Sequence, residues 1–185
     1  ILSVDNYVPT SYTAFYNRAE QAKFADYVVI MGYDEHTLGD EAGSVASIKW
    51  VTEGVTNTLA SVPAEQIILG MPFYTRVWEL TPQDTENVEV SDETSYKVTS
   101  SVYGMSNAAK NLANNNVTAE WSKEYGQNYA EWTVDNSIFK VWLEDSDSIE
   151  EKLKLVDSNS LAGAAFWKLG FETSNIWDTI IKYIN

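Results

Sequence analysis

The sequence predicts an α/β protein in which strand–helix units share a parallel sheet. Four short apolar runs alternate with segments whose apolar residues recur at helical spacing. The runs are continuously apolar, which is typical of parallel strands buried on both faces. Residues 75–147 interrupt this rhythm. Four such units make either half of a (β/α)8 TIM barrel or a small open doubly wound sheet, and composition alone leaves both possibilities open.

The first three units occupy residues 1–74. The runs that predict strands are Ile1–Val4, Tyr27–Met31 and Ile67–Pro72. The proline ends the third strand because it cannot donate to a sheet ladder. Helices are expected over Phe15–Phe24 and where Ile48, Val51, Val55 and Leu59 fall at helical spacing.

The last unit occupies residues 148–185. Ser148–Glu151 has the form of a capping box and predicts the start of a helix. Gly163–Trp167 predicts the fourth strand. A final helix is expected to carry an apolar face made of Trp177, Ile180, Ile181 and Ile184.

The interruption at 75–147 reads as an α+β insertion between the last two strand units. Met105, Ala108, Ala109 and Leu112 predict a helix within it. The alternating runs Asn128–Val134 and Ile138–Leu143 predict strands.

Composition excludes several classes of function. The net charge is −15 and the 12 basic residues are scattered, so nucleic acid and anionic membranes are poor partners. No apolar run approaches the roughly 18 residues of a membrane span. Without cysteine and with a single histidine, no metal centre is expected, and no Gly-rich phosphate loop indicates a cofactor. The chain begins at Ile1 without a signal segment, so we expect that upstream residues were removed.

Polar and aromatic side chains collect where the predicted strands end. The four ends are Asp5–Tyr7, Tyr33–His36, Phe73–Arg76 and Trp167–Lys168. Parallel strands place their carboxyl ends on one rim, so these groups should converge. The chain also holds 7 Trp, 11 Tyr and 6 Phe residues. Core packing accounts for many rings, but Trp and Tyr also stack on sugar faces, so the rim suits a neutral, hydroxyl-rich ligand.

Three of these segments resemble strands of family 18 glycoside hydrolases, the chitinase-like enzymes. Met31–Asp34 resembles the Met-x-Tyr-Asp end of the sixth barrel strand, Ile68–Arg76 the seventh strand, and Gly163–Trp167 the eighth with its terminal Trp. The insertion lies where many members carry a small α+β domain. The bacterial branch that acts on cell-wall or spore peptidoglycan is similar in four segments: Tyr33–His36, Gly43–Ser47, Pro72–Trp78 and Lys168–Glu172.

The resemblance implies a partial TIM barrel, strands five to eight, with Ile1–Asp5 as strand five. The family's Asp-x-x-Asp-x-Asp-x-Glu motif on strand four, which supplies the general acid, has no match in the 185 residues. Asp145, Asp147 and Glu150 read only as an acidic lead-in to a helix. The chain therefore looks like the C-terminal half of such an enzyme, divided as 1–74, 75–147 and 148–185.

The resemblance also implies roles in a substrate-assisted reaction, in which the sugar's acetamido oxygen attacks its own anomeric carbon. Tyr33 would bind that acetamido group, and Asp34 the sugar or the acidic cluster. Trp167 would form the floor of the site. Further substrate contacts are expected from Asp5, Tyr7, Tyr74 and Arg76.

Structural alternatives remain open for each of these residues. In these alternatives, Tyr33 caps a strand end, Asp34 caps a loop, Trp167 packs in the core and Arg76 forms a surface salt bridge. Asp34 and Glu35 should point oppositely if the strand is extended. For His36, a loop role is favoured over catalysis.

The function expected from these features is hydrolysis of β-1,4-linked N-acetylglucosamine polymers, peptidoglycan or chitin, by a longer extracellular or cell-wall parent. This chain alone is expected to be inactive, because general acid catalysis contributes typically 10²–10⁴-fold. The alternatives are a non-catalytic carbohydrate-binding or interaction module and an open α/β domain with an unrelated ligand. Exposed edges of half a barrel further predict self-association, a covering segment or a rearranged sheet.

Overall fold

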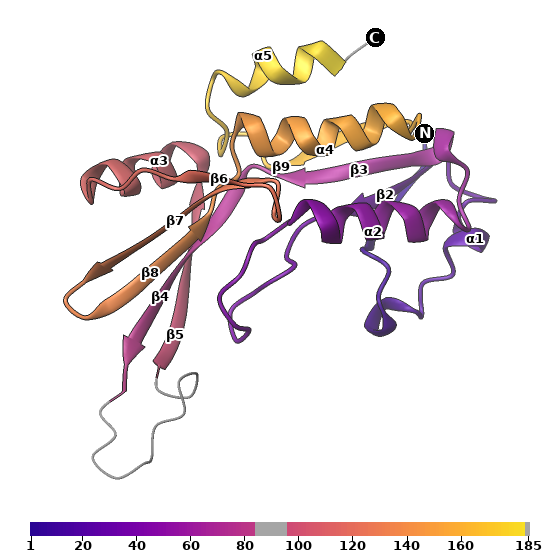
Figure 1. Cartoon of the computed structure of the whole chain (residues 1–185). Coiled ribbons are helices and arrows are strands. Elements are labelled where there is room, and N and C mark those ends of the chain that lie inside the picture. The colour runs from indigo at the N-terminus through magenta and orange to yellow at the C-terminus, as the bar shows by residue number, and fades with distance from the viewer. Residues whose placement is uncertain (84–95, 184–185) are drawn as a thin grey trace.

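Two sheets organise the computed structural model, which describes residues 1–83 and 96–183 (Figure 1). The first is a four-stranded parallel sheet in the order β1-β2-β3-β9. Its strands are β1 (Ser3–Tyr7), β2 (Tyr27–Met31), β3 (Ile67–Pro72) and β9 (Gly163–Trp167). The helices connected to it are α1 (Arg18–Gln21), α2 (Ile48–Leu59), α4 (Ser146–Ser158) and α5 (Ile176–Ile180). Strands two to four match the predicted runs, and the first begins at Ser3 rather than Ile1.

The second sheet is antiparallel, in the order β5-β4-β8-β7-β6. Its strands are β4 (Tyr74–Pro82), β5 (Tyr96–Gly104), β6 (Glu120–Ser122), β7 (Gln127–Val134) and β8 (Ser137–Trp142), with α3 (Met105–Asn114) beside them. Val77, Leu112, Ala130 and Val141 form a separate small core here. The predicted helix and two alternating strands are confirmed, whereas β4, β5 and β6 were not foreseen.

The two faces of the parallel sheet differ in burial. Val28, Ile30, Ile67 and Leu69 are fully or almost fully buried and belong to the main core with residues of α2, α4 and α5. Alternate residues lie on the opposite face, because successive strand side chains point to opposite sides. On that face Val29, Met31, Ile68 and Ala165 are only half-buried. The prediction that both faces are buried is therefore wrong for one face in this chain, which we call the open face.

The helix predicted over residues 15–24 is shortened to the single turn of α1. Its N-cap is Asn17, whose side chain accepts a hydrogen bond from Glu20 N at 3.2 Å. Phe15 and Phe24 are strongly exposed, and only Arg18 of α1 is buried. Because packing of an apolar face supplies most helix stability, a segment without one does not propagate.

The capping box of α4 lies three residues earlier than predicted. Asp145 is the N-cap, and its Oδ1 accepts hydrogen bonds from the backbone N–H groups of Asp147 and Ser148 at 3.0 and 3.1 Å. Ser148 occupies N3 and returns a bond through its Oγ, which accepts from Asp145 N at 2.9 Å. The acidic lead-in therefore contains the cap itself.

The last helix buries a different face from the predicted one. Ile176, Thr179 and Ile180 are buried, whereas Trp177 and Ile181 are exposed. The helix α5 gives way to a 3-10 turn at Ile181–Tyr183, which changes the angular spacing. Ile184, the fourth residue of the predicted face, lies outside the described residues.

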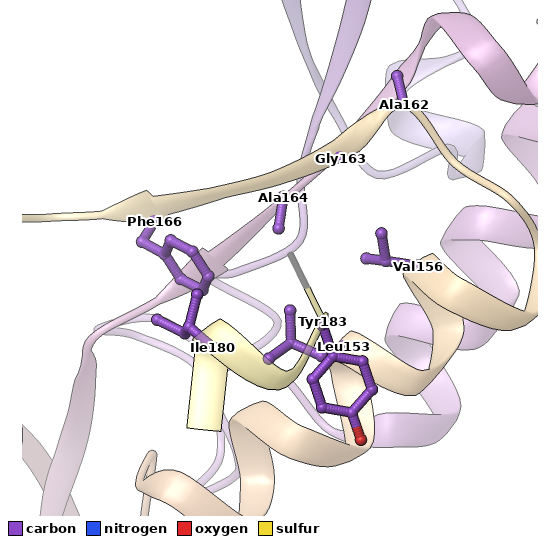
Figure 2. Close-up of a pocket in the computed structure, with 8 residues that line it drawn as sticks. All are labelled: Leu153, Val156, Ala162, Gly163, Ala164, Phe166, Ile180 and Tyr183. Atoms are coloured by element: carbon purple, nitrogen blue, oxygen red, sulfur yellow. The ribbon is translucent and has the colours of Figure 1, made fainter. Parts of the chain in front are cut away.

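The outer strands of the parallel sheet each have one neighbour within the described chain, β2 for β1 and β3 for β9. A groove of about 250 Å³ runs beside β9 on the helix side, and Figure 2 shows the apolar side chains around it. It is lined by Leu153, Val156, Ala162, Gly163, Ala164, Phe166, Ile180 and Tyr183. In the described parts, no helix is long and apolar enough to cross a bilayer.

Candidate functional site

A second pocket, of about 190 Å³, lies on the open face near the carboxyl ends of the parallel strands. It is lined by Asp5, Val29, Met31, Tyr33, Gly70, Ala165, Phe166 and Trp167. Three predicted site residues, Asp5, Tyr33 and Trp167, thus come together from β1, the end of β2 and β9. The lining residues Val29, Met31 and Ala165 were missed, because each run is apolar throughout and hides the two-residue period. Counting back by twos from Trp167 gives Ala165 and would have found part of the open face.

Trp167 presents its ring to the open face. Trp167 is 55% exposed, although it is the last residue of the apolar run that forms β9. The preceding Phe166 packs into the core, where its ring stacks on Phe73 at a centroid distance of 4.7 Å. The carbonyl of Trp167 accepts a hydrogen bond from Phe73 N at 2.8 Å, which fixes the backbone. The geometry therefore argues against a purely core role for this indole.

Tyr33 enters the pocket through a close approach of two strands. Gly32 N donates to Gly70 O at 2.9 Å, and a Cβ on Gly32 would meet that oxygen at 2.7 Å. Any larger residue at position 32 would therefore push β2 and β3 apart. Burial, followed by the nearby Asp34 and Asp5 carboxylates, raises the pKa of Tyr33. Its hydroxyl consequently stays protonated at neutral pH and can donate a hydrogen bond to a ligand.

Asp34 does not continue the extended strand. Its φ is +64°, in the left-handed region that Asp tolerates better than most residues. Its Oδ1 accepts a hydrogen bond from the Tyr74 hydroxyl at 2.6 Å. The neighbouring Glu35 turns away, and its carboxylate accepts from Ser47 N and Oγ at 2.6 and 2.9 Å. The carboxylates of Asp34 and Glu35 do have different partners. The expectation that an extended strand separates them is wrong, because the backbone at Asp34 is left-handed.

Tyr74 and Arg76 are each hydrogen-bonded to another side chain of the protein. Tyr74 is buried, and burial, followed by its hydrogen bond to Asp34, raises its pKa. Arg76 is half-buried on β4 and donates from a guanidinium nitrogen to Ser100 Oγ at 3.2 Å. Neither residue lines the pocket on the open face. Tyr7, half exposed at the end of β1, also lies outside that lining.

His36 takes part in loop structure. Its Nδ1 is 2.9 Å from Ser44 O, and a Cβ on Gly43 would meet the imidazole ring at 2.5 Å. Across residues 1–83 and 96–183, no group of three or more His, Asp or Glu side chains could hold a metal ion.

A model of the glycosyl hydrolases family 18 matches residues 2–172. The chain belongs to glycosyl hydrolase family 18. A Bacillus subtilis protein described as an uncharacterized glycosylase, YvbX, is 27% identical over 90% of the chain and 45% of its own length. The cortical fragment-lytic enzyme of Bacillus subtilis is 26% identical over 84% of the chain and 34% of its own length.

The spore cortex-lytic enzyme SleL of Bacillus cereus shares the fold, with a TM-score of 0.81 and 19% identity over 99% of this chain and 41% of that one. Solved chitinases share it too. The chain spans less than half the length of YvbX, of the cortical fragment-lytic enzyme and of SleL. The family 18 chain is glycosidase-like, with parallel and antiparallel sheets arranged as in these relatives.

Proposed function

We propose that this chain is the sugar-binding C-terminal half of a hydrolase for β-1,4-linked N-acetylglucosamine polymers. Peptidoglycan is the favoured polymer, because relatives from three Bacillus species are described as cortical fragment-lytic enzymes. Chitin is the other candidate. The parent would be extracellular or associated with the cell wall, where these polymers occur. The observation that carries the proposal is the pocket in which Tyr33, Asp5 and an exposed Trp167 lie together.

The side chains of this pocket suit an N-acetylated sugar. A pyranose has an apolar face that stacks on an indole and hydroxyls that need hydrogen bonds. In the substrate-assisted retaining scheme, the protonated Tyr33 hydroxyl donates to the acetamido group and orients its oxygen toward the anomeric carbon. Asp34 lies beside it and offers a carboxylate acceptor for the acetamido N–H or for sugar hydroxyls. Asp5 and Tyr7 supply further contacts along the same rim.

The chain alone is proposed to lack hydrolytic activity. The reaction needs a carboxylic acid to protonate the leaving oxygen, and the acidic motif of the family has no match in this sequence. Glu35 cannot replace it, because both of its carboxylate oxygens bind Ser47. The acid would come from strand four of a longer parent.

This proposal includes a partial barrel. Residues 1–74 would supply βα units five to seven, 75–147 the insertion, and 148–185 the last helix, strand and helix. It is supported by the all-parallel order of β1-β2-β3-β9 and by an apolar open face that would line a barrel interior. The groove beside β9 and the unpaired edge of β1 would then lie where further units pack.

The test has two arms. The chain is titrated with chitotetraose, and tryptophan fluorescence should saturate with a dissociation constant in the millimolar range. A version extended with the upstream reading frame should release sugars from chitin or spore-cortex peptidoglycan, whereas the chain alone should release none. Sugar binding without hydrolysis by an extended version that carries the acidic motif would favour a non-catalytic binding module. Absence of sugar binding by both versions would contradict the proposed function.

A further inference from the structure

The loop Asp34–Ser47 follows β2 and begins at a proposed site residue. It packs against the insertion. Its two ends are joined to each other. Glu35 N donates to Val45 O at 2.9 Å, His36 Nδ1 lies 2.9 Å from Ser44 O, and Ser47 N donates to Glu35 Oε2 at 2.6 Å. A shift of Gly43–Ser44 is therefore transmitted to Glu35, the residue next to Asp34. Asp34 depends on such support because its backbone lies in the left-handed region.

Among the described residues, the antiparallel sheet makes three side-chain hydrogen bonds to this loop. The Trp78 indole donates to Gly43 O at 2.8 Å, and Trp78 is fully buried. Ser44 Oγ donates to Gln127 Oε1 at 2.5 Å, and both residues are buried. Tyr74 reaches Asp34 directly at 2.6 Å. These contacts come from β4 and β7, two strands of the antiparallel sheet.

The side chain of Gln127 is also hydrogen-bonded to a buried ion pair. Its Nε2 donates to Glu144 Oε1 at 2.8 Å. Lys152 Nζ lies 3.0 Å from both carboxylate oxygens of Glu144, and Ser148 Oγ donates to Oε2 at 2.8 Å. The side chains of Glu144 and Lys152 are 0% exposed. Because each polar atom of Gln127 has a partner, its amide cannot rotate without leaving buried groups unpaired.

We propose that Trp78 and Gln127 are positioning residues, through which the insertion sets the conformation of the Tyr33–Asp34 segment. The inference rests on the proposed function for what that segment binds. The insertion then acts on the sugar indirectly, by holding the loop, and Tyr74 acts through Asp34. This differs from the direct substrate contacts expected of Tyr74 and Arg76.

The test compares variants that release the loop with a matched variant that does not. Ser44→Ala removes the hydroxyl bound to Gln127, and Trp78→Phe removes the indole N–H bound to Gly43. Thr58→Val removes an equally buried hydroxyl, bound to Gly54 O at 2.8 Å within α2. For each, hydrogen exchange of the Glu35 amide is measured by NMR, along with chitotetraose affinity and the melting temperature.

Both loop variants should exchange the Glu35 amide at least tenfold faster and bind chitotetraose about fivefold more weakly, relative to wild type. Thr58→Val should leave the Glu35 exchange rate and the chitotetraose affinity within twofold of wild type. It should lower the melting temperature by about as much as the loop variants do. Unchanged Glu35 exchange, or faster exchange with unchanged sugar affinity, would overturn the inference. If the wild type binds no sugar, the proposed function fails. Faster Glu35 exchange in both loop variants would then still show that Trp78 and Gln127 hold the loop.

Discussion

The hydroxyl of Tyr74 donates to Asp34 Oδ1 at 2.6 Å, joining the first residue of the insertion's sheet to the loop after β2. Tyr74 is buried, whereas Asp34 is exposed. The bond therefore links the interior to a carboxylate that is free to bind a ligand with its other oxygen. Since Asp34 lies next to Tyr33, its orientation also affects the electrostatic field at the Tyr33 hydroxyl.

Tyr74→Phe should weaken chitotetraose binding about threefold to tenfold and lower the free energy of unfolding by about 1 kcal/mol, a typical value for one lost hydrogen bond. The reason is that Asp34 loses the donor that orients it, while the ring still fills its site. Tyr129→Phe is a matched control, because Tyr129 donates to Glu131 Oε2 at 2.6 Å in the insertion. Equal effects of the two changes on sugar binding would contradict the proposal.

Trp167→Ala should abolish measurable chitotetraose binding and change stability by less than about 1 kcal/mol, because an exposed ring contributes little to the core. Trp121→Ala removes an indole that is 41% exposed on β6 of the insertion, and should leave binding intact. Fluorescence and NMR titrations measure both. Retained binding in Trp167→Ala would exclude this indole as the floor of the site.

The Glu144–Lys152 pair should show strong coupling. Lys152→Met leaves a buried carboxylate without its cation, and we expect a loss of about 3–5 kcal/mol in unfolding free energy. The double variant Glu144→Gln/Lys152→Met should lose less than that single variant, since no buried charge remains unpaired. Urea unfolding provides the comparison. Additive losses would show that the two side chains contribute independently.

Stability should fall as the solution becomes less acidic through the range in which Glu144 titrates. Burial raises the pKa of Glu144 to about 7, although Lys152 and Ser148 favour the ionised form. A carboxyl group whose folded pKa exceeds its unfolded value of about 4.3 binds its proton more tightly when folded. Its contribution is complete below about pH 4.3 and is lost as the pH rises through about 7. The wild-type unfolding free energy minus that of Glu144→Gln/Lys152→Met should therefore decrease between pH 4.5 and 7.5.

The chain should self-associate at concentrations of tens of micromolar. Within the described residues, the outer edges of β1 and β9 have no pairing strand, and together with a half-buried apolar face they favour association with a second copy. Ile68→Lys places a charge on the open face outside the sugar pocket and should give a monomer in sedimentation experiments. Val134→Lys changes an exposed apolar residue of β7 and should not. A wild type that is monomeric at high concentration would contradict this prediction.

Much of the parallel sheet was predictable from local pattern. The runs at 27–31, 67–72 and 163–167 contain no polar or charged side chain apart from the Tyr27 hydroxyl, and their limits match β2, β3 and β9. The insertion's helix and two of its strands were recognisable because they have one apolar face. The strand β4 was not predicted, because Pro72 indicates the end of a strand and Phe73–Arg76 was interpreted as the polar end of that strand.

The alternation of apolar strands with helices, and the positions of Asp5, Tyr33 and Trp167 at strand ends, follow from the amino-acid order alone. Local spacing is sufficient for these features, because they depend on neighbours within a few residues. The open face of the sheet, the bond from Tyr74 to Asp34 and the contacts of the insertion with the 34–47 loop arise from long-range packing. Those features depend on partners such as Ser44 and Gln127, which lie 83 residues apart. A hydrogen bond of that separation leaves no periodic signal in the chain, and its geometry exists only once both sheets have packed.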